Sequence, residues 1–247
     1  KVNRVEYNTN ILKDITLSGR NENNSVLHIA ANFKHGTPED EMKQSLKEYA
    51  VNLNQTTNTV GDYVFRFEPT TVKFNEVAWS VDTNPELNHS ITYRKKSGDF
   101  YIQRLRLYSD NSKLFLNEAV FKSAKDFSAD GGVKNLDISK IFALTKSENS
   151  MDIQGIANGT FDIKMNKNNL EPLIDFNIND ILMNGKDMGN VFISAKKSSV
   201  PNVFDVEAKV ISAGIIGDNN LHLTGTINNN TSSPTLDLTA DMNDFDI

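Results

Sequence analysis

Apolar and polar residues alternate with a period of two along most of the chain. Apolar residues occupy alternate positions in residues 27–33, 63–67, 77–81 and 161–165, and later runs repeat the pattern. Successive side chains of a strand point to opposite sides, so each run predicts a strand with one apolar and one polar face. Stretches rich in Asn, Asp, Gly and Ser separate the runs, as turn residues do. The pattern predicts an all-β protein built mostly from antiparallel strands.

Two segments depart from this alternation and predict short helices. The first is expected near residues 38–50, where Thr37 can cap the helix and Pro38 suits its first turn. The acidic residues 39–41 then lie near the positive end of the helix dipole. An apolar stripe at helical spacing would follow from Met42, Leu46 and Ala50. The second helix is expected near residues 139–145.

The glycine pair Gly131-Gly132 suggests a turn and a soft boundary between two halves. Residues 1–130 would then form a β meander with the helical insertion near 38–50. Residues 131–247 would continue the β structure after the short helix near 139–145.

Composition narrows the functional classes. Hydrophobic residues make up 38% of the 247 residues, a low share that fits a thin, elongated structure with little interior. The net charge of −6 argues against nucleic acid as a partner, because phosphate binding needs a basic face. The chain has no cysteine, which excludes disulfides, Cys-ligated zinc and cysteine nucleophiles.

The candidate chemical groups give no catalytic pattern. His28 and His222 each stand between two apolar residues and are expected on the polar faces of strands, whereas His35 and His89 are expected in turns. All four are interpreted as surface residues, and none has the spacing of a metal ligand. The sequence therefore predicts no enzyme activity, no cofactor and no metal site.

No segment approaches the roughly 18 apolar residues of a membrane-spanning helix. The chain begins with Lys1, and its final residues still alternate at Leu236, Leu238, Ala240 and Met242. Both ends are interpreted as cuts through a longer protein.

Several stretches resemble TamB-like proteins of the Bacteroidetes type. The resemblance rests on residues 63–70 (YVFRFEPT), 78–82 (AWSVD), 102–110 (IQRLRLYSD), 134–139 (KNLDIS) and 153–163. It implies an elongated, U-shaped antiparallel sheet, the β-taco trough of the AsmA-like and bridge-like lipid-transfer proteins. It also implies a periplasmic location, with an N-terminal helix in the inner membrane and a TamA-like barrel partner in the outer membrane.

The function expected from this resemblance is phospholipid transport along an apolar trough, in support of outer-membrane biogenesis. The alternatives are an assembly factor that templates outer-membrane β-barrel proteins by strand augmentation, a structural β-solenoid with a solid core, and a closed sandwich core. The residues expected to contact acyl chains form one apolar surface: Phe161, Ile163, Met165, Phe176, Ile178, Val191, Ile193, Val206, Leu221, Leu223, Leu236 and Leu238.

Overall fold

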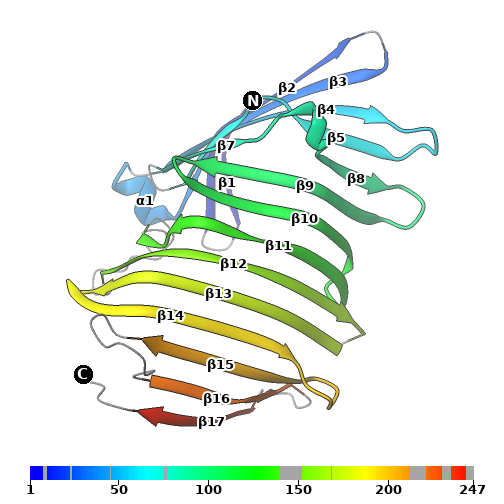
Figure 1. Cartoon of the computed structure of the whole chain (residues 1–247). Helices are drawn as coiled ribbons and strands as arrows, with labels where there is room; N and C mark the ends of the chain where they lie inside the picture. Colours follow the sequence, from blue (N-terminus) through cyan, green and yellow to red (C-terminus); the bar gives the residue numbers. More distant parts are fainter. Residues whose placement is uncertain are drawn as a thin grey trace. The chain divides into compact units, whose positions relative to one another are not determined.

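The computed structural model describes residues 1–7, 10–22, 24–44, 46–74, 77–139, 152–167, 169–211, 221–229 and 235–242 (Figure 1). The chain divides into two compact units, Lys1–Asp110 and Asn111–Ile247. Each unit is built almost entirely from antiparallel strands, so the predicted all-β antiparallel architecture is confirmed.

The first unit is a sheet with one short helix. Its elements are β1 (Val2–Tyr7), β2 (Asn10–Glu22), β3 (Val26–Gly36), α1 (Pro38–Met42), β4 (Lys47–Thr57), β5 (Tyr63–Phe67), β6 (Thr71–Phe74), β7 (Val77–Val81), a 3-10 turn (Pro85–Leu87), β8 (Ser90–Arg94) and β9 (Asp99–Ser109). Strands β1 to β4 pair in chain order. Strand β4 then pairs with both β5 and β6, and β9 pairs with both β8 and β7.

The core of the first unit includes buried residues on the short strands β5 and β7. Trp79 is 2% exposed, and Val81 and Val64 are also buried. Thr70 fills the break between β5 and β6: its hydroxyl donates to the carbonyl of Asn52 at 3.2 Å and accepts from the amide of Asn52 at 3.1 Å. The side chain of Thr70 thus replaces strand hydrogen bonds that the break removes.

The predicted first helix begins as expected but is much shorter. Thr37 caps it, with its hydroxyl accepting from the amide of Asp40 at 3.2 Å. The helix ends at Met42, and β4 begins at Lys47, so the expected stripe through Leu46 and Ala50 is wrong. The cause is long-range pairing, because β4 aligns with β3 and places Val51 opposite Ala31. The second expected helix, near 139–145, lies outside the described residues beyond Ser139.

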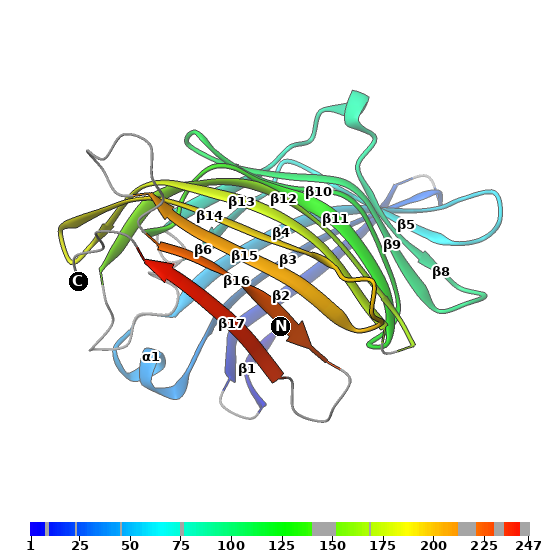
Figure 2. The ribbon, with the colours of Figure 1, turned by 60° about the horizontal axis from the view of Figure 1, so that its bottom comes forward.

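The second unit is an antiparallel meander of β10 (Ser112–Ser123), β11 (Asp126–Asp137), β12 (Ile153–Asn166), β13 (Asn169–Met183), β14 (Lys186–Lys197), β15 (Val203–Ile211), β16 (Leu221–Asn228) and β17 (Thr235–Met242). Each strand pairs with the next. Within this unit, the extensive contacts of each described strand are with the strands that it pairs with. The sheet of this unit is therefore a single layer. Strands β10 to β14 bend along their length (Figure 2).

The turn predicted at the glycine pair is wrong. Gly131 and Gly132 lie in the middle of β11 and pair with β10 on one side and β12 on the other. A Cβ atom on Gly132 would lie 2.2 Å from the carbonyl oxygen of Gly159, so glycine is needed for close backbone approach. The boundary expected at 130/131 therefore falls inside one strand, and the chain divides into its two compact units between Asp110 and Asn111.

Two β-bulges in the second unit are held by asparagine side chains. The left-handed residues are Asn135 in β11 (φ 49°) and Asp180 in β13 (φ 53°), where the register shifts. Asn158 Oδ1 accepts from the amide of Asn135 at 2.8 Å, and Asn190 Oδ1 accepts from the amide of Asp180 at 3.0 Å. These side chains satisfy amides that leave the ladder, and bulges of this kind increase the local twist of a sheet.

Candidate functional site

The alternating residues of the second unit merge into one apolar face. Phe176 on β13 lies opposite Ile193 on β14, which lies opposite Ala208, Leu223 and Ala240 on the three following strands. Directly opposed residues of antiparallel strands point to the same side of the sheet. A continuous row of apolar side chains therefore crosses five strands.

All twelve residues expected to contact acyl chains lie on this side of the sheet. Phe161 lies opposite Ile174, Ile178 opposite Val191, and Leu238 is aligned with Val206 through Gly225. We call this surface the apolar face. It comprises Phe161, Ile163, Met165, Leu170, Ile174, Phe176, Ile178, Val191, Ile193, Ala195, Phe204, Val206, Ala208, Val210, Leu221, Leu223, Ile227, Leu236, Leu238, Ala240 and Met242.

The apolar face is open in the part of the chain that the structure describes. None of the twelve predicted residues is fully buried, and Ile193, Leu236 and Leu238 are 40%, 61% and 43% exposed. Inner-facing residues of a sandwich would be covered by a second sheet about 10 Å away. The closed-sandwich alternative is therefore wrong for the described strands of this unit.

Glycines let aromatic rings lie down on the apolar face. A Cβ atom on Gly159 would lie 2.7 Å from Cγ of Phe176, and one on Gly131 would lie 3.0 Å from Cζ of Phe161. Each ring therefore occupies the space above a glycine on the neighbouring strand. The arrangement covers exposed backbone with apolar surface.

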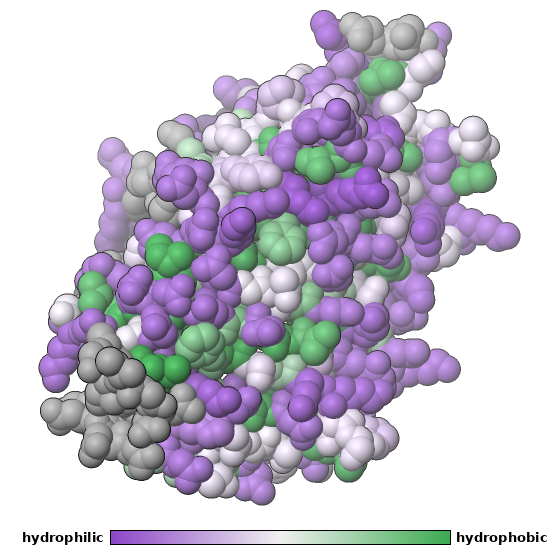
Figure 3. Space-filling view, in the orientation of Figure 1, coloured by the Kyte–Doolittle hydropathy of each residue, from purple (hydrophilic) through white to green (hydrophobic). Residues whose placement is uncertain are grey.

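The opposite side of the same sheet is polar. One row across it runs through Asp175, Ser194, Glu207, Thr224 and Thr239. Polar side chains dominate the view in Figure 3, with scattered apolar residues between them. The sheet is thus amphipathic, with one apolar and one polar side, as alternation along an antiparallel strand produces.

A cavity of about 420 Å³ opens on this polar side beside Phe192, which is 37% exposed. Its lining includes Asp175, Ser194, Glu207 and Lys209. Glu207 and Lys209 form an ion pair with each other, and the lining includes no activated nucleophile.

Glu207 links two strands through ion pairs. Its Oε1 lies 2.7 Å from Lys209 Nζ and 2.7 Å from His222 Nε2. The hydrogen bond from Lys209, followed by that from His222, lowers the pKa of the Glu207 carboxyl below its ordinary value of 4.5. A depressed carboxyl pKa stabilises the fold above the unfolded-state pKa, and this contribution is lost as pH falls through the folded-state value.

Replacing Glu207 by Gln is expected to lower the free energy of unfolding by about 0.5 kcal/mol at pH 7, since the ion pairs are largely solvent-exposed. At pH 3 the difference should be smaller than at pH 7, because the contribution of the ion pairs is lost as the pH falls through the lowered pKa of the wild-type carboxyl. Urea denaturation at both pH values measures the effect. Asp175→Asn, on the same cross-strand row, is the control. An equal loss at pH 7 and pH 3 would show that the ion pairs do not contribute.

The histidine interpretation is only partly right. His28 Nδ1 lies 3.0 Å from Glu68 Oε1, and His222 also pairs with a carboxylate, so both lie on polar surfaces as expected. His35 belongs to β3 and not to a turn. His89 is 5% exposed, with Nε2 3.3 Å from the carbonyl oxygen of Phe67, so its expected surface position is wrong. The local sequence gives no sign that the break between β5 and β6 encloses it.

The first unit also carries an apolar side that the predicted site did not include. Ile29, Leu53 and Phe67 are aligned across β3, β4 and β5. Phe33 stacks on Tyr49 at a centroid distance of 5.1 Å. The same alternation that marks the second unit could have identified these residues.

Within the described ranges, no group of three or more His, Asp or Glu side chains is placed to hold a metal ion. No helix in those ranges combines the length and apolar character needed to cross a bilayer.

Comparison of the chain with protein-family models, curated proteins and solved structures finds no match. The exposed apolar face of the second unit is the candidate site, because a contiguous apolar surface can make non-covalent contacts with an apolar partner.

Proposed function

We propose that this chain is a segment of a TamB-like envelope protein whose apolar face carries phospholipid acyl chains across the periplasm of a diderm bacterium. The observation that carries the proposal is the uncovered apolar face of a single-layer sheet, formed by every second residue of successive strands. Exposed contiguous apolar surface of this kind marks a binding site in a folded protein.

The dimensions of the second unit suit an acyl chain. The six described strands that carry the apolar face, β12 to β17, are spaced about 4.8 Å apart and give a band roughly 24 Å long across the sheet. One acyl chain spans half of a hydrocarbon core about 30 Å thick, or roughly 15 Å. Each methylene removed from water contributes about 0.8 kcal/mol, so contact along such a band favours binding.

Transfer along a face requires that the chain be able to leave each position. Side chains that are half-exposed on an open sheet offer contact on one side only, and water or other lipid remains on the other. A bound chain can therefore move from row to row without any bond being broken. On this proposal the protein is not an enzyme, and its partners are the inner membrane and a TamA-like barrel in the outer membrane.

The edge of β17 favours a second candidate function, strand augmentation of outer-membrane β-barrel proteins. Among the described residues β17 pairs only with β16, and all eight of its residues are exposed. An unpaired edge presents backbone donors and acceptors to an incoming strand.

Photocrosslinking tests the lipid proposal directly. A photoreactive amino acid at Ile163 or Ile193, on the apolar face, is expected to capture phospholipid in cells. The same group at the adjacent Lys164 or Ser194, on the polar side, is the control and should capture none. Mass spectrometry of the purified adducts identifies the lipid. Equal capture on both sides, or none on the apolar face, would contradict the proposal.

A further inference from the structure

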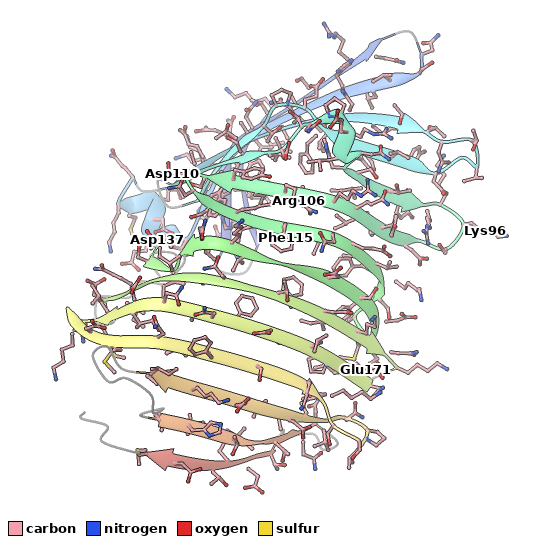
Figure 4. All side chains as sticks on the ribbon, viewed as in Figure 1. Lys96, Arg106, Asp110, Phe115, Asp137 and Glu171 are labelled. Atoms are coloured by element: carbon pink, nitrogen blue, oxygen red, sulfur yellow. The ribbon has the colours of Figure 1, made fainter. Side chains whose placement is uncertain are left out.

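The second unit has two borders, formed by the turns that alternate between the ends of its strands. One border contains the turns β10–β11, β12–β13, β14–β15 and β16–β17. The other contains the connections β11–β12, β13–β14 and β15–β16, together with the start of β10 and the end of β17. Asp137 and Glu171 lie toward opposite borders (Figure 4).

Charge differs in sign between these borders. We count, among described residues, each turn and the two strand residues on either side of it. The first border, which we call the lysine border, holds one aspartate, Asp126, and five lysines, a net charge of +4: Lys122, Lys125, Lys167, Lys196 and Lys197. Counting one further strand residue on each side adds Lys164, Glu171, Asp205 and Asp237 and gives a net charge of +2. The opposite border holds two lysines and four aspartates, a net charge of −2: Lys113, Lys186, Asp137, Asp152, Asp187 and Asp241.

The turns of the lysine border are joined by hydrogen bonds. The amide of Lys167 donates to the carbonyl oxygen of Lys125 at 2.8 Å. Asn202 accepts from the amide of Leu170 through Oδ1 at 3.2 Å and from the amide of Asn229 through its carbonyl at 2.8 Å. These bonds link neighbouring turns, so the lysines are spaced along one edge of the sheet and not scattered on independent loops.

The lysine border adjoins the apolar face. Lys197 follows Ala195 by two residues, so it continues the alternation of that face, and it lies opposite the buried Phe204. Lys197 is paired with Glu171, and Lys122 with Asp126. Lys125, Lys167 and Lys196 make no ion pair with any described residue. Lysine stems lie along apolar surface while the ammonium groups remain in water.

We propose that the lysine border binds the negatively charged headgroups of phospholipids whose acyl chains lie on the apolar face. This inference rests on the proposed function and adds the charge class of the lipid and its orientation across the sheet. A phosphodiester near several ammonium groups is attracted, whereas one near the aspartates of the opposite border is repelled. The lipid therefore lies with its headgroup toward the lysine border, where Lys125 and Lys167 stand in turns and Lys196 stands at the end of β14, on its polar side.

Short-chain lipids below their micelle concentration test the inference on the whole 247-residue chain. Titration calorimetry at low ionic strength compares diheptanoyl phosphatidylglycerol, which is anionic, with diheptanoyl phosphatidylcholine, which is zwitterionic. The Kd for the anionic lipid is expected to be about tenfold lower. Raising the ionic strength to about 0.5 M should reduce that preference to within about twofold, because salt screens exposed charges.

The variant Lys125→Gln, Lys167→Asn, Lys196→Gln is expected to lose the tenfold preference and keep the affinity for phosphatidylcholine. Asparagine suits position 167, where φ is 49°. The matched control replaces Lys113, Lys134 and Lys186 by Gln and removes the same charge away from the lysine border. It should keep the preference. Circular dichroism checks that both variants remain folded.

The outcomes separate the two proposals. If both lipids bind equally well, or if the two triple variants behave alike, the headgroup inference is wrong and the acyl-chain proposal stands. If neither lipid binds, both proposals are wrong. Glycerophosphoglycerol and inorganic phosphate, which have no acyl chains, should not bind measurably. If they bind as tightly as the lipid, the lysine border is an anion site unconnected with lipid.

Discussion

Replacing Ile193 by Asp is expected to abolish lipid binding while leaving the second unit folded. Ile193 stands in the middle of the apolar face, between Phe176 and Ala208 on the adjacent strands. Its side chain is 40% exposed, so a carboxylate there stays hydrated and should cost only about 1 kcal/mol of folding free energy. An acyl chain that crossed this position would have to remove water from the carboxylate, which costs several kcal/mol.

The neighbouring residue provides a matched control. Phe192 is 37% exposed and lies on the polar side of the same strand, so Phe192→Asp introduces the same charge without touching the apolar face. Lipid binding is measured by titration and folding by urea denaturation. Unfolding of the Ile193→Asp variant would indicate a covered core, and retained lipid binding would place the lipid elsewhere.

The second large effect is expected at Trp79. Trp79→Ala should lower the free energy of unfolding of the first unit by about 3–5 kcal/mol, the range for truncating a buried aromatic side chain. Trp79 is 2% exposed and stands on β7, where the sheet passes from the paired short strands to β9. Alanine would leave most of the volume of the buried indole empty.

Leu17 serves as the control, because it is 69% exposed on β2 of the same unit. Leu17→Ala should change the free energy of unfolding by no more than about 0.5 kcal/mol. Urea denaturation followed by circular dichroism measures both variants. Equal midpoints for wild type and Trp79→Ala would show that the first unit is not held together at this position.

The alternation of residues was sufficient to predict strands and to divide each strand into an apolar and a polar side. Phe161, Ile163 and Met165 must share one side of β12, because the side-chain period of a strand is two. The same local chemistry identified the cap at Thr37 and the start of α1. These features depend on residues near one another in the chain, so the sequence alone determines them.

Whether different strands present their apolar sides together was decided by the register. A slip of one residue between β13 and β14 would place Ile193 opposite Asp175 or Asn177. The side chain of Ile193 would then lie on the polar side of the sheet. The bulges at Asn135 and Asp180 shift this parity within a strand, and Asn side chains of neighbouring strands accept hydrogen bonds from their amides. The continuity of the apolar face is therefore a tertiary property.

The remaining differences between expectation and structure arise from long-range contacts. Ala50 joins a strand because β3 offers β4 a pairing partner that outweighs the helical spacing. Gly131 and Gly132 resemble a turn in the sequence, but they are needed where Phe115, Phe161 and the backbone of β12 approach β11 closely. The openness of the apolar face also depends on long-range contacts. Alternation is identical in a closed sandwich and an open sheet, and only the packing of the strands shows which is present.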